Sequence, residues 1–390
     1  SNCSFKVKMP MISVNIDSLV PDFVKRFEPY VPSRPDDVLK RFYGCDTLYR
    51  MNNNENPLGP PPSAAEVVRK FPPPSASIYP SGDSFHLCNE LARHLQVSPE
   101  QVIVGNGANE VIAFVIKAFC REGDNIVTAD KTFAVYEWLA EFSGFEARLV
   151  PLRDYSFDQQ GLLGQVNART KIIFICNPNN PTGTYWSQEK LESFLDQVNG
   201  RWIVVVDEAY FEFCTARDYP DSIRLIERYP NLVVFRTFSK MYGLAGLRIG
   251  YLVGSKELVQ EVRRTVVVYS VNSVAQQAAL AALNDDAGHL SRSRDMVAQG
   301  KEFLEGELSA LGLEVVSGQG NFVMAKLPIS DVYVYQKLMA KGVMVRTMTG
   351  FRFPNWIRIT ISHPEALQAC TRHLGRILEQ NGPDKGRERG

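Results

Sequence analysis

The stretch Val234-Phe-Arg-Thr-Phe-Ser-Lys240-Met-Tyr-Gly-Leu-Ala-Gly-Leu-Arg248 decides how the rest of this sequence is interpreted. Its first residues are apolar and typical of a buried strand, and Lys240 follows directly in a loop of small residues. A lysine in this setting is poorly suited to a surface role. Its long stem can deliver an amine to a carbonyl group, and burial near a second cation lowers the pKa of that amine enough to make it a nucleophile.

Arg248 lies beyond two glycines of the same stretch and suits a phosphate group carried by the carbonyl compound that Lys240 would hold. The combination predicts Schiff-base chemistry with a phosphorylated aldehyde. The candidate compound is pyridoxal phosphate.

The composition restricts the partners of the chain. It has 390 residues with 43 Lys and Arg against 43 Asp and Glu, and it has no polybasic block of the kind that binds nucleic acid. No apolar run reaches the roughly 18 residues that span a bilayer. The seven cysteines are scattered, with no zinc-like spacing, which favours reduced thiols. We therefore expect a cytoplasmic protein that binds no metal, membrane or nucleic acid.

Strands and helices alternate from residue 101 to residue 236, and the strands at 171–176, 202–206 and 232–236 are rich in Val and Ile. This pattern predicts an α/β fold with a mainly parallel sheet. We expect an N-terminal arm and part of a small domain at 1–55, a large cofactor-binding domain at 56–290, a C-terminal small α+β domain at 291–380 and a flexible tail at 381–390. A long helix is expected from about Arg294 to Leu311.

Two turns at strand ends carry candidate ligand groups. In Gly105-Asn-Gly-Ala-Asn-Glu110, the backbone amides at the start of a helix could hold a phosphate, although an ordinary turn explains the motif equally well. In Cys176-Asn-Pro-Asn-Asn-Pro-Thr-Gly183, Asn180 could donate a hydrogen bond to a phenolate oxygen, or the segment is a plain turn.

Asp207 ends the apolar strand at 202–206, where a buried carboxylate needs a positive partner. A protonated pyridine nitrogen would be such a partner and would keep the ring able to withdraw electrons. Tyr210 could reach the hydroxyl of the same ring, and Phe133 could stack on it. The simpler interpretations are a helix cap for Asp207 and a core position for Phe133.

Arg346 and Arg358 lie on predicted strands of the small domain. Arginine side chains match carboxylate or phosphate groups with two parallel hydrogen bonds, although two surface ion pairs are the alternative.

These motifs together resemble the fold-type-I aminotransferases of the aspartate aminotransferase superfamily. Within it, Pro29-Tyr-Val-Pro32, Asn54-Glu-Asn-Pro-Leu-Gly59, Tyr79-Pro80 and Leu244-Ala-Gly-Leu-Arg248 are most similar to histidinol-phosphate aminotransferases. The segment Phe351–Trp356 departs from the family pattern.

The resemblance implies a role for each matching residue. Lys240 would bind the cofactor aldehyde, Asp207 would pair with the pyridine nitrogen, Asn180 and Tyr210 would hold the ring oxygen, and Phe133 would stack on the ring. The cofactor phosphate would be bound by Ala108, Asn109, Thr237, Ser239 and Arg248. Tyr79 would reach the site of a neighbouring subunit in a homodimer. The substrate would contact Tyr30, Asn56, Arg346 and Arg358.

The expected reaction is transamination of L-histidinol phosphate with 2-oxoglutarate, a step of histidine biosynthesis. An aromatic amino acid is the second donor. A decarboxylase acting on a phosphorylated amino acid such as threonine phosphate shares this fold, and a pyridoxal-phosphate-binding regulator is the least favoured alternative because no DNA-binding segment is evident.

Overall fold

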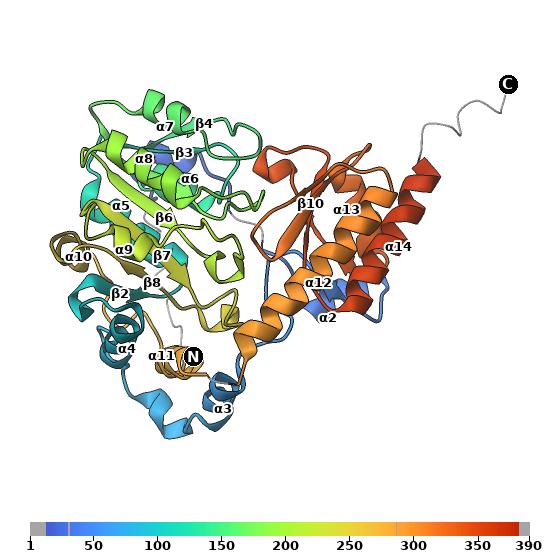
Figure 1. Ribbon diagram of the computed structural model, residues 1–390, viewed down its shortest axis with the longest axis horizontal. Coiled ribbons are helices and arrows are strands. Elements are labelled where there is room, and N and C mark those ends of the chain that lie inside the picture. The colour runs from blue at the N-terminus through green and yellow to red at the C-terminus, as the bar shows by residue number, and fades with distance from the viewer. Residues whose placement is uncertain (1–12, 30–31, 286, 382–390) are drawn as a thin grey trace, which may run out of the picture.

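The computed structural model describes residues 13–29, 32–285 and 287–381, which form a large α/β body and a smaller α+β body side by side (Figure 1). The large body is built on a seven-stranded sheet in the order β2-β8-β7-β6-β5-β3-β4. Strand β8 runs antiparallel to both neighbours, and the other pairs are parallel. The expected fold, α/β with a mainly parallel sheet, is confirmed.

The strands of this sheet are β2 Val102–Gly105, β3 Asn125–Ala129, β4 Glu146–Val150, β5 Thr170–Cys176, β6 Ile203–Asp207, β7 Leu232–Thr237 and β8 Gly250–Val253. Every residue of β7 is buried, as are the last four of β6. Burial on both faces explains why these strands are runs of Val, Ile and Leu rather than alternating patterns.

Helices lie on both faces of the sheet (Figure 1). They are α3 Pro62–Lys70, α4 Phe85–Leu95, α5 Ala108–Phe119, α6 Val135–Glu141, α7 Gln159–Gln165, α8 Gln188–Val198, α9 Ser222–Leu225, α10 Lys256–Arg263 and α11 Ser273–Leu283.

The smaller body contains an antiparallel sheet in the order β12-β13-β10-β9. Its strands are β9 Val315–Ser317, β10 Phe322–Lys326, β12 Arg346–Thr347 and β13 Trp356–Thr360. Its helices are α12 His289–Ala310, α13 Asp331–Met339 and α14 Pro364–Asn381, drawn in orange and red in Figure 1.

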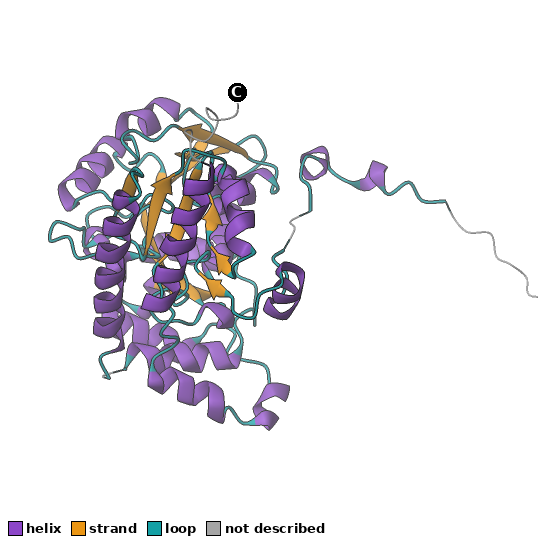
Figure 2. Ribbon diagram, turned by 90° about the vertical axis from the view of Figure 1, so that its right-hand side faces the viewer, coloured by secondary structure: helices purple, strands orange, loops and turns teal. Residues whose placement is uncertain are grey.

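The N-terminal part is divided between the two bodies and an arm. Strand β1 Tyr49–Arg50 pairs with β11 Val343–Met344 of the small body, and α2 Asp36–Tyr43 precedes it. The earlier elements, η1 Asp17–Leu19 and α1 Asp22–Lys25, belong to an arm (Figure 2) that contacts the large body where the ring centre of Phe27 lies 5.7 Å from that of Phe142. We propose the domain boundaries given above on this basis; apart from Asn381, the expected tail lies outside the described residues.

The long helix starts earlier than expected, at His289 rather than Arg294. The polar composition around residues 284–293 indicated a linker. His289 and Ser293 are nevertheless buried, because the ring of His289 lies 3.1 Å from the carbonyl of Met241 and Ser293 accepts a hydrogen bond from Asn56. These polar side chains are buried contacts between the two bodies.

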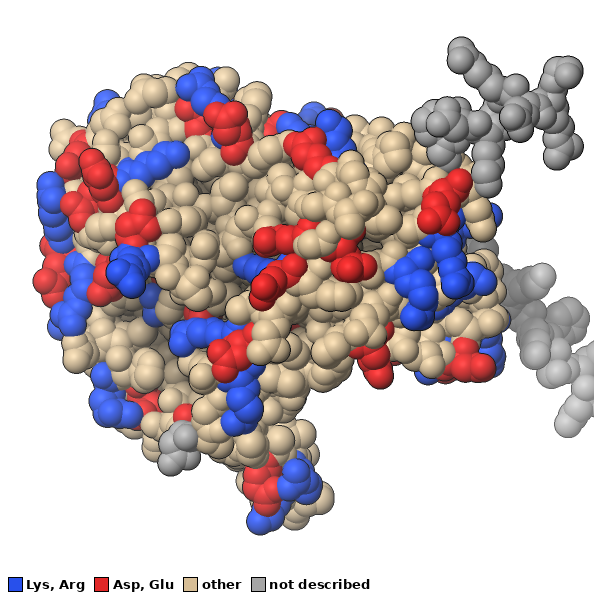
Figure 3. Space-filling model, turned by 45° about the vertical axis from the view of Figure 1, so that its right-hand side comes forward, with Lys and Arg blue, Asp and Glu red and all other residues tan. Residues whose placement is uncertain are grey.

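Positive and negative side chains are interspersed over the face shown in Figure 3, in line with the balanced composition. Among the helices that the structure describes, none is both long and apolar enough to cross a membrane.

Candidate active site

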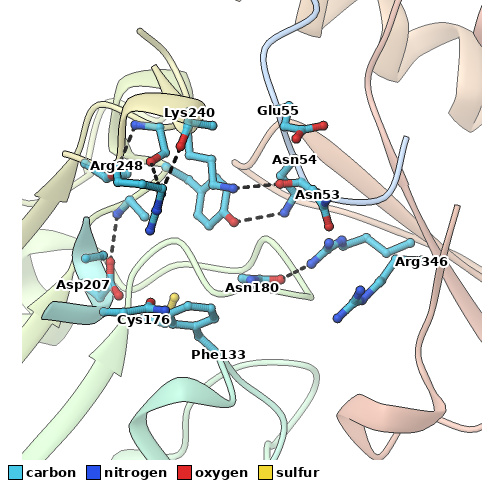
Figure 4. Close-up of a pocket in the computed structure, with 18 of the residues that line it drawn as sticks. Asn53, Asn54, Glu55, Phe133, Cys176, Asn180, Asp207, Lys240, Arg248 and Arg346 are labelled. Atoms are coloured by element: carbon cyan, nitrogen blue, oxygen red, sulfur yellow. Dashed lines mark hydrogen bonds between the residues drawn. The ribbon is translucent and has the colours of Figure 1, made fainter. Parts of the chain in front are cut away.

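A cavity of about 370 Å³ lies between the two bodies, at the carboxyl ends of β5, β6 and β7 (Figure 4). Ligands bind at this edge in open α/β sheets. The predicted site residues that line the cavity are Ala108, Asn109, Phe133, Asn180, Asp207, Tyr210, Thr237, Ser239, Lys240, Arg248, Arg346 and Arg358. Residues at or after the ends of β2, β3, β5, β6 and β7 therefore share one cavity with residues of the small body.

Lys240 lies in the turn after β7 and points into the cavity (Figure 4). Its Nζ donates a hydrogen bond of 2.8 Å to the carbonyl of Asn53 and lies 5.8 Å from the ring centre of Tyr210. Burial, and secondly the positive charge of Arg358, lower the pKa of Lys240 to about 8. A substantial fraction of the amine is therefore neutral near physiological pH, as a nucleophile or a general base requires.

Asp207 is the last residue of β6 and is 2% exposed. One carboxylate oxygen accepts a hydrogen bond of 2.6 Å from the hydroxyl of Tyr136, and the other accepts one of 3.1 Å from the amide of Ala209. Burial raises the pKa of Asp207 to about 6, although both hydrogen bonds oppose that rise. These donors are neutral, so the site suits a cation placed against this carboxylate.

An anion site is formed where α5 begins. Thr237, Ser239 and Arg248 surround the helix N-terminus, and Nη1 of Arg248 donates a hydrogen bond of 3.3 Å to the hydroxyl of Ser239. Gly107 caps α5 with φ of 80°, and a Cβ atom there would collide with the guanidinium of Arg248. The free amides of the helix terminus and the arginine together favour a phosphate group.

Arg346 and Arg358 are paired residues on the adjacent strands β12 and β13. Arg358 is 4% exposed and donates hydrogen bonds from Nη1 to the side chain of Asn180 and from Nη2 to the carbonyl of Asn52. Its Nε is buried without a partner, and burial lowers its pKa to about 10. The surface ion-pair alternative is wrong for Arg358. A buried guanidinium that has only neutral hydrogen-bond partners among the described residues favours an anion in the cavity beside it.

Hydrogen bonds between the two bodies hold the hydroxyl of Tyr210, the group predicted to bind the ring oxygen of the cofactor. The hydroxyl of Tyr210 accepts a bond of 3.0 Å from Asn54, and the side chain of Asn54 in turn accepts one of 3.0 Å from Thr360 of β13. Asn180 reaches the cavity from the turn after β5, and its side-chain oxygen accepts a hydrogen bond from Arg358 (Figure 4).

Three predicted residues are not placed in this cavity. The amide of Asn56 donates to the carbonyl of Met241 and to Ser293, at 2.8 and 2.9 Å, so it holds the loop in place and does not face a substrate. Tyr79 is 81% exposed and stacks on Tyr269. Tyr30 lies outside the described residues.

Several residues of the site were not predicted from the sequence. Tyr136 of α6 is fully buried behind the cavity, where its ring centre lies 5.6 Å from that of Phe133 and its hydroxyl donates a hydrogen bond to Asp207. Its spacing of three residues from Phe133 is a signal that could have identified it. Asn53, Asn54 and Phe351 reach the cavity from segments distant in sequence. Their positions depend on the docking of the two bodies, for which the local sequence offers no signal.

The donor set fits pyridoxal phosphate. The cavity offers an amine for an aldehyde, an anion for a ring nitrogen and a cradle for a phosphate, and Phe133 and Tyr210 provide aromatic surfaces. Together with the α/β fold, these features define a pyridoxal-phosphate-dependent enzyme.

Comparison with known proteins gives the family. The model of the aminotransferase class I and II family matches residues 47–373. The chain is 39% identical over 362 residues to a histidinol-phosphate aminotransferase of Anaeromyxobacter sp. (strain Fw109-5), covering 92% of this chain and 99% of the relative. It is 40% identical over 352 residues to a histidinol-phosphate aminotransferase of Halalkalibacterium halodurans, covering 90% and 95%.

Among solved structures, the fold is similar to that of histidinol-phosphate aminotransferase from Sinorhizobium meliloti in complex with pyridoxal-5'-phosphate. The TM-score is 0.82 at 26% sequence identity, with 91% of this chain and 98% of that chain covered. The chain belongs to the aminotransferase class I and II family, and its cofactor is pyridoxal phosphate.

Proposed function

We propose that the protein transfers the amino group of L-histidinol phosphate to 2-oxoglutarate, giving imidazole acetol phosphate and L-glutamate in histidine biosynthesis. The similarity to histidinol-phosphate aminotransferases over nearly the whole chain supports this assignment. The main structural support for it is Arg358, which lies with Arg346 in the same cavity as Lys240. The guanidinium of Arg358 is buried, and its Nε has no partner among the described residues. These two arginines suit the phosphate of one substrate and the carboxylates of the other.

The bound cofactor supplies a ring that withdraws electrons from the carbon bearing the substrate amine. Lys240 holds the cofactor aldehyde in the resting enzyme and, once released, accepts the proton of that carbon at Nζ. The lowered pKa of this amine supports the assignment, because a base works best with a pKa near the working pH.

The remaining residues bind and orient. Asp207 keeps the ring nitrogen protonated, and Tyr136 keeps the carboxylate of Asp207 in place through its hydrogen bond. Asn180 and Tyr210 hold the ring oxygen, and Phe133 covers one face of the ring. Ala108, Asn109, Thr237, Ser239 and Arg248 bind the cofactor phosphate.

We further propose a cytoplasmic homodimer with shared active sites. Exposed apolar side chains gather on two segments, Ile78 and Tyr79 on one and Val267, Val268 and Tyr269 on the other, and the stacked pair Tyr79 and Tyr269 joins them. Exposed apolar patches of this kind mark association surfaces. Covering them with a second copy would bring Tyr79 to the cofactor site of that copy.

A panel of amino donors with 2-oxoglutarate tests the assignment. Glutamate formation should be fastest with L-histidinol phosphate, slower with phenylalanine and tyrosine, and slow or absent with phosphothreonine. Carbon dioxide release from phosphothreonine, measured in parallel, would identify a decarboxylase instead. Turnover of phenylalanine but not of histidinol phosphate would replace the first donor with an aromatic amino acid.

A further inference from the structure

The loop from Thr349 to Asn355 places a third aromatic side chain in the cavity. Phe351 ends the short helix η6 Thr349–Phe351, and its ring centre lies 5.9 Å from the guanidinium carbon of Arg346 and 5.7 Å from that of Arg358. The ring therefore lies against both arginines of the proposed anion site.

The cofactor has no evident use for this ring. Among the described residues, three phenylalanine and tyrosine side chains line the cavity, and the proposed roles of Phe133 and Tyr210 account for two of them. Phe351 remains on the side of Arg346 and Arg358, where a substrate would place its phosphate and the carbon chain that carries it. Arginine faces and aromatic faces both favour flat partners.

The loop that carries Phe351 is built around a buried carboxylate. Asp331 is 1% exposed and accepts hydrogen bonds from the amides of Met348 and Thr349, at 2.9 Å each, and from the hydroxyl of Thr349 at 2.7 Å. The amide of Asn355 donates to the same carboxylate at 3.3 Å. Asp331 thus fixes both ends of the loop within the small body.

A second contact fixes the loop to the large body. The guanidinium of Arg352 donates to both carboxylate oxygens of Glu137 in α6, at 2.7 and 3.0 Å, and to the carbonyl of Asp130 at 2.9 Å. Arg352 has φ of 62°, a left-handed conformation that costs energy for a residue other than glycine. The bidentate ion pair across the two bodies offsets that cost.

An aromatic and methionine cluster supports the same arrangement. Met348, Phe353 and Trp356 pack together, and Tyr155 of the large body lies against them with its ring centre 5.7 Å from that of Trp356. The loop is therefore held from both sides, and Phe351 stays beside the two arginines.

We propose that Phe351 is a specificity-determining side chain that selects a flat ring carried on the same carbon chain as the substrate phosphate, and that Arg352, through Glu137, positions Phe351. The inference rests on the proposed function, because it assigns the anion site at Arg346 and Arg358 to a substrate phosphate.

The first test compares two ligands that differ only in the flatness of one ring, 2-phenylethyl phosphate and 2-cyclohexylethyl phosphate. Isothermal titration calorimetry on the holoenzyme should show tighter binding of the phenyl ester by roughly two- to tenfold, the range expected for one aromatic contact. In Phe351→Leu and in Phe351→Met the preference should fall to within about twofold, whereas inorganic phosphate should bind as it does to the unchanged protein. The matched control Phe42→Leu alters an exposed phenylalanine outside the cavity and should keep the preference.

The second test measures the positioning role of Arg352 by amide hydrogen exchange of residues 348–356. Arg352→Ala and Glu137→Gln should each speed exchange of this loop, and the double variant should be no faster than Arg352→Ala, because Glu137 acts on the loop only through Arg352. Arg228→Ala, which removes an ion pair within the large body, is the control and should leave the loop unchanged.

The outcomes separate this inference from the proposed function. Equal binding of the two esters to the unchanged protein, or a preference retained in both Phe351 variants, would contradict the proposal that Phe351 selects a flat ring. Unchanged exchange in Arg352→Ala would assign loop order to Asp331 alone and overturn the positioning role. Neither readout depends on turnover, so failure to transaminate histidinol phosphate would reject the proposed donor while leaving the ring preference to be judged on its own result.

Discussion

At the scale of single residues, the cavity gathers the two side chains on which the sequence interpretation depends. Lys240 and Asp207 are both strand-end residues of the same sheet, so the sequence alone indicated that they would lie near one another. Tyr136 and Asn54, the direct partners of Asp207 and Tyr210, were not identified. Their importance follows from hydrogen bonds that exist only once the sheet, α6 and the small body are packed together.

The buried carboxylate of Asp207 has a consequence for stability. Its pKa is raised to about 6 from an ordinary value of 3.8, so the folded protein binds more protons than the unfolded chain between these pH values. The contribution to stability is present below about pH 4 and is lost as the pH rises through 6, by about 3 kcal/mol at most.

Asp207→Asn should therefore make the cofactor-free protein more stable at pH 8 and should flatten its stability between pH 4 and pH 6. Calorimetric unfolding at a series of pH values measures both effects. The control is Asp196→Asn at an exposed position, where a change of no more than about 0.5 kcal/mol is expected. A less stable Asp207→Asn protein at pH 8 would mean that the carboxylate already has a cationic partner.

At the scale of elements, the strands from β2 to β7 and the helices α5, α6 and α8 were predicted to within one or two residues, because their Val- and Ile-rich runs and amphipathic periods are local signals. The short helices α7 and α9 were not predicted. The segment from β8 to α11 was not predicted. Strand β8 is short and runs antiparallel within an otherwise mostly parallel sheet, and α11 is an alanine-rich helix packed against α3 and α4, so neither has a clear apolar period. The predicted start of α12 was wrong because the first residues of the helix include polar side chains, His289 and Ser293, whose burial is not evident from the sequence.

The N-terminus of α5 provides a prediction for the phosphate cradle. Gly107→Ala should weaken pyridoxal phosphate binding by about tenfold or more, because the added Cβ atom meets the guanidinium of Arg248 and the positive φ disfavours alanine. Fluorescence titration of the cofactor-free protein measures the dissociation constant.

Gly246→Ala is the matched control, because a Cβ atom at that glycine has no neighbour within 4 Å and its φ is not in the left-handed region. Unchanged cofactor affinity in Gly107→Ala would show that the turn at Gly107 does not position Arg248. It would contradict the proposal that the two form the phosphate site.

At the scale of the whole molecule, the two bodies and the proposed second copy each contribute to one site. The docking of the bodies is carried by contacts between remote segments, such as Asn54 with Tyr210 and Arg352 with Glu137. Contacts of this kind explain why the small domain could be expected from composition while the residues it brings to the cavity could not.

Shared active sites predict complementation between inactive variants. Lys240→Ala and Tyr79→Ala should each have little activity alone. After mixing, dissociation and reassociation, about a quarter of the activity per site should return, because half of the dimers are mixed and each mixed dimer has one intact site. Absence of recovery, with mixed dimers demonstrated by native mass spectrometry, would confine each site to one chain.

The most direct measurement is the location of the covalent link between protein and cofactor. The holoenzyme is reduced with sodium borohydride, digested and analysed by peptide mass spectrometry. A phosphopyridoxyl group should be found on Lys240 in nearly all molecules, and Lys240→Ala should bind the cofactor without being labelled. A label on a lysine other than Lys240, or no label in an active enzyme, would contradict the assignment of Lys240.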